Sequence, residues 1–271
     1  MKLAVNLWTV YGWDLPEMVS TDVLRALAQM GASGVELIVD DQFNSPEALL
    51  AREQKINDLL KRVGLQVPGV ATTLFWRYNL ASQDEDLRQR GLELIREGCC
   101  VARAFNASCL LILAGQQEAG IEYARSYEIA VASVRQGAAY AADLGIILAV
   151  ENVRGNFLCS PGEYARFLAD VGHPSVQAYL DFGNGMSVGP SYPDNWIAAV
   201  RGRIVAVHAK GYDKYLDAYV CCGLGDVPWE RTFSALRDVK TPPRGYGKGR
   251  PSREAGLHAA RTSLQWLARF V

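Results

Sequence analysis

The sequence predicts an α/β protein with the fold of a (β/α)8 TIM barrel whose eighth strand is irregular or missing. Two observations support this fold class. Strand-like apolar runs alternate with helical segments along the 271 residues, at intervals of about thirty residues. Three of the apolar runs also end on an ionisable side chain. Because all strands of a barrel direct their carboxyl ends to one face, such side chains would meet there.

Seven apolar runs, all rich in valine, isoleucine and leucine, predict the strands. They are nearly continuous rather than alternating with polar residues, which is typical of parallel strands buried on both faces. The runs cover residues 2–8, 34–39, 66–72, 109–114, 146–151, 176–181 and 204–209.

The segments between these runs have helical spacing together with start and stop signals. One helix is expected to begin with Thr21 as its N-cap and to end at Gly31. Another has Ser45 as its cap and Pro46 at the first helical position. The predicted helices cover residues 21–31, 45–64, 82–105, 125–144, 160–172, 228–239 and 252–271.

This alternation, without any linker-like tract, predicts repeated right-handed βαβ units in a single domain over residues 1–271. An open doubly wound sheet is the competing architecture. If it bound a dinucleotide, a G-x-G-x-x-G motif would follow the first strand, and residues 6–13 (NLWTVYGW) contain none. The length, the even spacing and the polar residues at successive strand ends therefore favour the barrel.

The eighth strand is the exception to this pattern. Residues 240–251 (KTPPRGYGKGRP) contain prolines and glycines and no apolar run. The strand is therefore very short, near residues 239–241, or the barrel is open or irregular there. We predict an irregular segment beside the first and seventh strands, which would leave the neighbouring site more open than in a closed barrel.

Composition narrows the function classes. The net charge is -1 and basic residues form no block, which argues against nucleic-acid binding. Residues 1–18 are too short and too interrupted for a signal peptide or a membrane span. The six cysteines include no C-x-x-C pair, so reduced thiols are expected. These features together predict a cytoplasmic protein without membrane or nucleic-acid partners.

Three of the apolar runs end on the residues Glu151, Asp181 and His208. Each residue alone has an ordinary structural explanation: a surface carboxylate, a turn residue and a hydrogen-bonded core histidine. Burying an unpaired charge costs several kcal/mol, so three such strand ends together favour a shared target. Two carboxylates and one imidazole suit a divalent metal, with Mn²⁺ or Mg²⁺ favoured and Co²⁺ or Zn²⁺ compatible.

The chain resembles the sugar phosphate isomerase/epimerase superfamily with the xylose isomerase-like TIM barrel. The resemblance is carried by the segments VNLW (5–8), GASGVELIVD (31–40), AVENVRGNF (149–157), AYLDFGNGM (178–186), VHAKG (207–211) and GLGDVPWERTFSAL (223–236). It implies one divalent metal held by Glu151, Asp181, His208 and a glutamate of the eighth strand. Members include ketose 3-epimerases, hexulose-phosphate epimerases, inosose dehydratases and hydroxypyruvate isomerases. We therefore expect a metal-dependent isomerase or epimerase that acts on a ketose through an enediolate, with Mn²⁺ as the expected ion.

The chain departs from this family pattern at two positions. Many relatives carry histidine three residues after the strand-six aspartate, where this chain has Asn184. Asparagine can hydrogen-bond a substrate hydroxyl but cannot transfer a proton near neutral pH. The strand-eight glutamate has no counterpart, since Glu254 falls in the predicted final helix and suits a charge near the helix terminus. We expect water or Glu254 in place of the fourth ligand.

Further candidates follow from their positions. Glu151 is the candidate for both metal ligand and catalytic base. Asn152 and Arg154 follow the fifth strand, where the arginine could hold a substrate oxygen or phosphate. Lys210 shares the face of His208 by strand alternation and could stabilise an enediolate.

Two sets of residues complete the candidates for substrate binding. Glu36 lies inside the second strand, which implies a polar barrel interior. Trp8 and Trp76 follow the first and third strands and could form apolar walls for a sugar ring.

The expected partner is a small sugar or sugar phosphate, and the protein could form a homo-oligomer. A dehydratase or lyase that uses the same metal site, and a non-catalytic metal- or sugar-binding barrel, are the alternatives.

Overall fold

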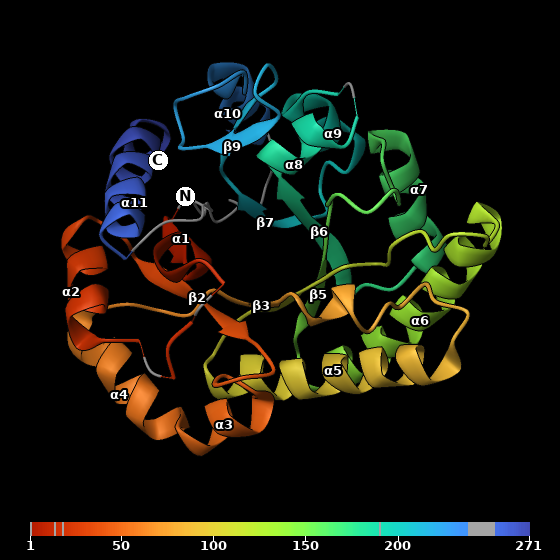
Figure 1. Cartoon of the computed structure of the whole chain (residues 1–271), viewed down its shortest axis with the longest axis horizontal. Helices are drawn as coiled ribbons and strands as arrows, with labels where there is room; N and C mark the ends of the chain where they lie inside the picture. The colour runs from red at the N-terminus through yellow and green to blue at the C-terminus, as the bar shows by residue number, and fades with distance from the viewer. Residues whose placement is uncertain (1, 14, 18, 190, 238–252) are drawn as a thin grey trace.

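The computed structural model describes residues 2–13, 15–17, 19–189, 191–237 and 253–271. Within these residues, seven parallel strands form one curled sheet in the order of the chain. They are β1 (Ala4–Asn6), β2 (Gly34–Val39), β3 (Gly69–Thr72), β4 (Cys109–Ile112), β5 (Ile147–Glu151), β6 (Val176–Asp181) and β7 (Ile204–His208). Figure 1 shows the strands at the centre with the helices around them. The barrel fold and the place of all seven predicted strands are confirmed.

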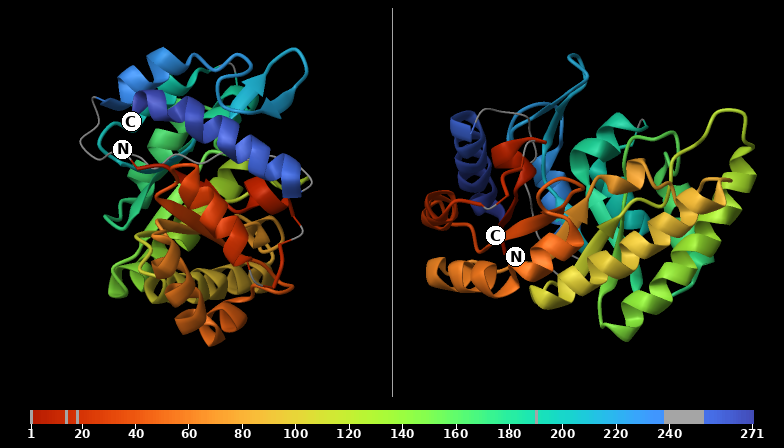
Figure 2. Two further views of the ribbon diagram at one scale, coloured as in Figure 1. Left: turned by 90° about the vertical axis from the view of Figure 1, so that its left-hand side faces the viewer. Right: turned by 60° about the horizontal axis from the view of Figure 1, so that its bottom comes forward.

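The sheet is open, because β1 and β7 are its edge strands and do not pair with each other in the described residues. The predicted irregular segment at 239–251 lies outside the residues that the structure describes. The N- and C-terminal ends of the chain lie side by side (Figure 2). An open, seven-stranded sheet is consistent with a barrel whose eighth strand is irregular.

The long helices follow the strands as the sequence predicts. They are α2 (Thr21–Gln29), α3 (Pro46–Ala51), α4 (Glu53–Val63), α5 (Glu85–Ala104), α6 (Tyr123–Asp143), α7 (Pro161–Val171), α10 (Trp229–Arg237) and α11 (Arg253–Leu267). Two details differ. The cap of α2 is Ser20, whose hydroxyl accepts from the Val23 amide, rather than Thr21. The single helix predicted over 45–64 is broken at Arg52, whose guanidinium donates to the carbonyls of Glu17 and Phe43.

Several short elements were not predicted. They are α1 (Trp8–Tyr11), η1 (Leu74–Trp76), α8 (Phe182–Ser187), α9 (Pro193–Ala199) and a hairpin formed by β8 (Gly211–Asp213) and β9 (Ala218–Val220). Elements of three to seven residues are too short to show a hydrophobic period. Four of them, α1, η1, α8 and the hairpin, follow the carboxyl ends of β1, β3, β6 and β7, where a barrel places its active site.

Close backbone packing joins the last helix to the first. A Cβ atom on Gly256 of α11 would lie 2.5 Å from the Val10 carbonyl oxygen of α1. Only glycine allows this approach, because any larger residue would force the two helices apart. The contact fixes α1, and with it Trp8, against the C-terminal part of the chain.

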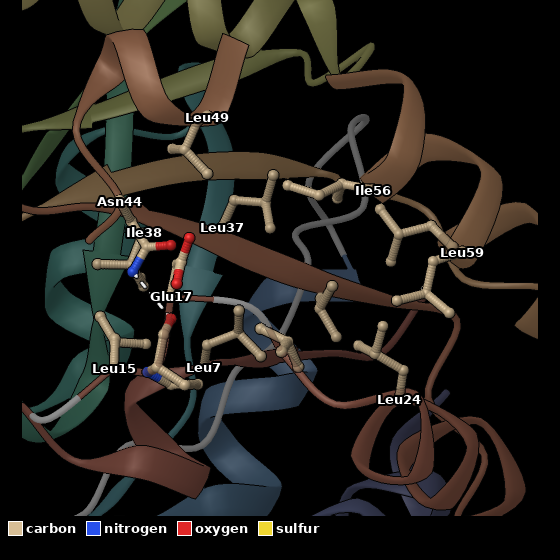
Figure 3. Close-up of a pocket in the computed structure, with 14 residues that line it drawn as sticks. Leu7, Leu15, Glu17, Leu24, Leu37, Ile38, Asn44, Leu49, Ile56 and Leu59 are labelled. Carbon is tan, nitrogen blue, oxygen red and sulfur yellow. Dashed lines mark hydrogen bonds between the residues drawn. The ribbon is translucent and has the colours of Figure 1, made fainter. Parts of the chain in front are cut away.

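A gap of about 30 Å³ lies between β2 and the helices that cover it (Figure 3). Its lining is mainly aliphatic, with Leu24, Leu37 and Ile56 among the side chains. Asn44 lies at one end and donates to the Pro16 carbonyl. A gap this small and apolar is a packing imperfection of the core rather than a binding site.

Among the described residues, no helix combines the length and the apolar character that crossing a membrane requires.

Candidate metal centre

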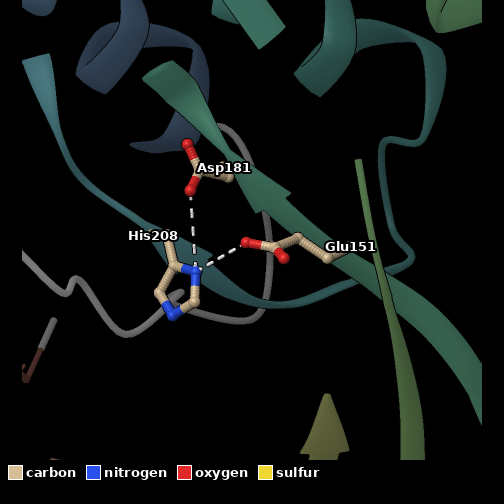
Figure 4. Close-up of side chains that lie close together, drawn as sticks. All are labelled: Glu151, Asp181 and His208. Carbon is tan, nitrogen blue, oxygen red and sulfur yellow. Dashed lines mark hydrogen bonds and ion pairs between the residues drawn. The ribbon is translucent and has the colours of Figure 1, made fainter. Parts of the chain in front are cut away.

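Glu151, Asp181 and His208 converge at one point, as the sequence predicts. They are the last residues of β5, β6 and β7, and the strand register places Asp181 directly beside His208. The imidazole Nδ1 atom of His208 lies 2.8 Å from Oε1 of Glu151 and 3.7 Å from Oδ2 of Asp181 (Figure 4). One ligand atom from each residue lies within 4.8 Å of the other two. All three side chains are buried.

The donor set fits a divalent cation. Two carboxylates and one imidazole supply oxygen and nitrogen donors and two negative charges. Oδ2 of Asp181 is buried and, within the described residues, accepts no hydrogen bond of regular geometry. It does form an ion pair with Nζ of Lys210 at 2.8 Å. This buried group could therefore hold a metal ion.

The protonation of His208 reflects the charges around it. Burial alone would lower its pKa, but Glu36 and Glu151 oppose this and raise the pKa to about 9. Without a cation, the imidazole is therefore charged at neutral pH and donates from both ring nitrogens to Glu151 and Glu36. A divalent ion at Nδ1 would displace the proton on that nitrogen and take over its charge.

Glu36 does not reach the cavity. It is fully buried in β2, and its carboxylate contacts Asn6, Tyr179 and the Nε2 atom of His208, which lies 3.0 Å from Oε2. The position of Glu36 in the sequence predicts a substrate contact. In the structure it lies behind the imidazole, as part of the polar barrel interior that the sequence also implied.

The Asp-Phe-Gly-Asn-Gly sequence at the end of β6 forms a cap. Oδ1 of Asp181 accepts from the Asn184 amide at 2.8 Å and so begins α8. Asn152 holds the backbone of the same aspartate, accepting from its amide at 2.7 Å and donating to its carbonyl at 3.0 Å. Asn152 therefore acts on the backbone of Asp181 and does not line the cavity. These contacts leave Oδ2 directed at Lys210 and His208.

The glycines of this segment allow α8 to lie against the site. A Cβ atom on Gly183 would be 2.7 Å from Cγ of Lys210. With glycine there, the Lys210 side chain passes beside α8 and brings its ammonium group to Asp181 and to Oδ1 of Asn184, at 2.9 Å. Lys210 is almost completely buried.

A cavity of about 430 Å³ opens beside this group, and Glu151 is the residue of the group that lines it. Six candidates from the sequence analysis line it: Trp8, Trp76, Glu151, Arg154, Asn184 and Lys210. The remaining lining includes Trp13, Thr72 and Tyr219. Aromatic rings and a few polar groups form the typical lining of a small-molecule site.

Tyr219 is the main residue that the sequence analysis missed. It lies on β9, and its hydroxyl donates to Oδ1 of Asn184 at 2.8 Å. The Lys210 ammonium lies 3.9 Å from the centre of its ring. The sequence does contain a signal for the hairpin, since GYDKYLDAYV (211–220) places aromatic residues on both sides of a polar turn.

The same hairpin holds Arg154. The guanidinium forms an ion pair with Asp217, and it donates to the Tyr212 hydroxyl at 3.3 Å. These contacts raise the pKa of Arg154 against the opposing effect of burial. Arg154 thus lines the cavity while its charge is partly satisfied by the hairpin.

Glu254 is exposed in the first turn of α11. Among the described residues, the metal-ligand group contains Glu151, Asp181 and His208 and does not include Glu254. It is therefore a charge near the helix terminus, and it does not take the place of a fourth ligand.

Comparison with known proteins decides the family. Residues 24–270 match the family described as Xylose isomerase-like TIM barrel. The chain belongs to this family. It is 27% identical over 221 residues to L-ribulose-5-phosphate 3-epimerase UlaE of Shigella boydii serotype 18, covering 79% of this chain and 76% of that protein.

Solved structures show the same fold at lower sequence identity. D-allulose 3-epimerase from Methylomonas sp. in complex with D-allulose has a TM-score of 0.79 and 19% identity, covering 100% of this chain and 97% of the other. The probable 3-DHS dehydratase AsbF from Bacillus anthracis has a TM-score of 0.78 and 16% identity, covering 99% of both chains. This fold therefore occurs in proteins that are named for different reactions.

Proposed function

We propose that this protein is a metal-dependent epimerase or isomerase of a ketose sugar. The observation that supports the proposal most is the buried Glu151–Asp181–His208 group, whose Glu151 lines a 430 Å³ cavity with aromatic walls. A sugar offers adjacent carbonyl and hydroxyl oxygens for a metal and apolar ring faces for tryptophan. The epimerase names of the relatives support this reaction class.

Glu151 is the proposed base. Its carboxylate lines the cavity and lies beside Nδ1 of His208, so it reaches both the substrate space and the cation position. A bound divalent ion, with Mn²⁺ expected, supplies positive charge that polarises the ketose carbonyl and acidifies the neighbouring C–H. Glu151 then removes that proton to leave an enediolate. Return of the proton by Glu151 to the adjacent carbon would give the isomer, and protonation of the opposite face by a water molecule would give the epimer.

Lys210 and Asn184 stabilise the enediolate in this proposal. The Lys210 ammonium lies on the cavity wall beside Asp181 and provides a fixed positive charge. The Nδ2 atom of Asn184 is buried and has no hydrogen-bond partner among the described residues. With Oδ1 already occupied by Lys210 and Tyr219, the amide presents a donor to a substrate oxygen.

Arg154 and the tryptophans orient the sugar. Trp8 and Trp76 line the cavity and offer flat surfaces to the apolar face of the ring. Arg154 stands at the cavity wall, where its guanidinium could donate to a sugar hydroxyl or to a terminal phosphate. The substrate is therefore a small ketose or ketose phosphate, and the reduced cysteines expected for this chain suit the cytoplasm.

The test is a turnover screen with controlled metal content. Metal-depleted protein receives Mn²⁺ and is incubated in D₂O with D-allulose, D-fructose, L-ribulose and L-ribulose 5-phosphate. We expect a new ketose or aldose with deuterium at the carbon that exchanged its proton, and no product without metal. An epimer formed without deuterium incorporation would contradict the enediolate step.

A dehydratase that uses the same residues is the second candidate, favoured by the fold shared with AsbF. Loss of water from a cyclic keto-polyol, detected as a new enone absorbance, would identify it. Tight Mn²⁺ binding with no turnover in either assay would favour a non-catalytic metal- or sugar-binding barrel.

A further inference from the structure

Glu36 holds a position that the proposed reaction does not explain. It is fully buried in the middle of β2, and both of its carboxylate oxygens accept hydrogen bonds from other side chains. A buried carboxylate is costly unless it is paired and hydrogen-bonded. Its neighbours come from three other strands: Asn6 of β1, Tyr179 of β6 and His208 of β7. The acid therefore serves these side chains rather than a ligand in the cavity.

The contact with His208 determines which ring nitrogen faces which group. Nε2 lies 3.0 Å from Oε2 of Glu36, and Nδ1 lies 2.8 Å from Oε1 of Glu151. Figure 4 shows Nδ1 directed at both carboxylates of the candidate centre, with Nε2 on the far side of the ring. The ring of Tyr179 packs against the imidazole, with 4.6 Å between the ring centres.

We propose that Glu36 is a positioning residue that accepts the Nε2–H of His208 and so presents Nδ1 to the cation. This role rests on the metal-dependent function proposed above. A carboxylate behind a metal-binding histidine fixes its tautomer and orientation and makes the coordinating nitrogen more basic. The negative charge of Glu36 also favours a cation on the other side of the imidazole.

The other contacts of Glu36 hold its carboxylate in place. Oε1 accepts from the Tyr179 hydroxyl at 2.9 Å, and Oε2 accepts from Nδ2 of Asn6, its partner in the β1–β2 register. Oδ1 of Asn6 accepts from the Trp8 amide at 2.8 Å. The chain of hydrogen bonds thus runs from His208 of β7 to the start of α1, and it links strands on both sides of the open sheet.

The experiment uses the full chain and the variant Glu36→Gln, which keeps the size of the side chain and removes its charge. Mn²⁺ and Zn²⁺ binding to metal-depleted protein is measured by calorimetry. We expect the dissociation constants to rise about tenfold to a hundredfold. Tyr179→Phe is the matched control, since it removes a hydrogen bond to the same carboxylate and keeps the ring against His208. It should change the affinity less.

A second measurement does not depend on the variant. In the Zn²⁺-loaded wild-type protein, nitrogen-15 NMR should show Nδ1 of His208 bound to metal and Nε2 protonated. Metal on Nε2 would overturn the proposal even if Glu36→Gln failed to fold. Unchanged affinity of a folded Glu36→Gln variant would overturn it as well, while leaving the metal centre intact. If the wild-type protein binds neither ion, the proposed function fails, and the role of Glu36 fails with it.

Discussion

The two sides of the cavity are built in different ways. On one side, Glu151, Asp181 and His208 are the last residues of three hydrogen-bonded strands, and their side chains are at most 5% exposed. On the other side, the β8–β9 hairpin contributes Tyr219, which is 39% exposed. Figure 2 shows the hairpin projecting from the rim.

This difference separates two tasks. Groups that bind a cation need fixed geometry, and a strand ladder provides it because each backbone position is held by hydrogen bonds to a neighbouring strand. Groups that face a substrate lie on connections, which can change without disturbing the core. Changes to the strand side should therefore alter metal binding, and changes to the hairpin should alter catalysis with the metal still bound.

The largest effect is expected from His208→Ala. The variant loses the one nitrogen donor of the Glu151–Asp181–His208 group, and it leaves Glu36 and Glu151 buried without their shared partner. We expect no Mn²⁺ binding by calorimetry. The metal-free variant should also lose about 3–5 kcal/mol of stability, the usual cost of breaking a buried ion pair.

His258→Ala is the matched control, because this histidine is exposed on α11. It should bind Mn²⁺ as the wild-type protein does. Wild-type Mn²⁺ affinity in His208→Ala would contradict the assignment of metal binding to the strand ends, since the metal would then have to bind elsewhere.

A smaller loss is expected from Asp181→Asn. The change removes a charge directed at the cation, while the amide oxygen can still accept from the Asn184 amide and cap α8. Mn²⁺ affinity should fall at least about tenfold. The midpoint of thermal unfolding should change little, which would separate the loss of a ligand from the loss of the cap.

Asp217→Asn sharpens this prediction. Asp217 is a carboxylate of the hairpin, exposed and paired with Arg154. Its neutralisation should leave Mn²⁺ affinity unchanged. Equal losses in the two variants would show that general negative charge near the cavity, rather than the strand-end position, attracts the metal.

The strand side could be predicted from the sequence because each of its features leaves a signal. Continuous apolar runs identify the strands, and parallel order brings Glu151, Asp181 and His208 to one face. The direction in which the Glu36 side chain points could not be predicted. A charged residue inside a strand indicates a polar interior, but only the curl of the sheet places β2 opposite β7 and so brings Glu36 to Nε2 of His208.

The hairpin side escaped prediction for a different reason. Three-residue strands have too few positions to show alternation, so the aromatic residues on both sides of the polar turn are the one local signal for the hairpin. Arg52, at the break between α3 and α4, donates to the backbone carbonyls of Glu17 and Phe43, and local helix signals do not report such contacts. Such features arise from tertiary contacts rather than from local propensity.

Lys210→Met tests the boundary between the two sides. Lys210 follows β7 on the chain, and its ammonium contacts Asp181, Asn184 and the ring of Tyr219. On a substrate identified by the screen, kcat should fall about a hundredfold, as when one group that stabilises developing charge is removed. Mn²⁺ affinity should not fall, because the variant removes a competing cation from Asp181.

Lys214→Met is the control for this variant. Lys214 belongs to the hairpin region, and its ammonium donates to the Tyr192 hydroxyl at 3.2 Å, outside the cavity lining. Lys214→Met should convert the substrate with the kcat of the wild-type protein. If Lys210→Met lost metal instead of turnover, Lys210 would belong functionally to the metal centre.

The smallest effect is expected from Tyr219→Phe. The variant keeps the ring beside the Lys210 ammonium and removes the hydroxyl that donates to Oδ1 of Asn184. The Asn184 amide is then held by Lys210 alone and presents its Nδ2 donor less firmly, so kcat/KM should fall about three- to tenfold, the range of one hydrogen bond. Mn²⁺ affinity should stay unchanged. Tyr215→Phe, at the 95% exposed tip of the hairpin, should match the wild-type protein. A loss of metal in Tyr219→Phe would contradict the division between strand ends and hairpin, because it would show that the hairpin also maintains the geometry of the metal ligands.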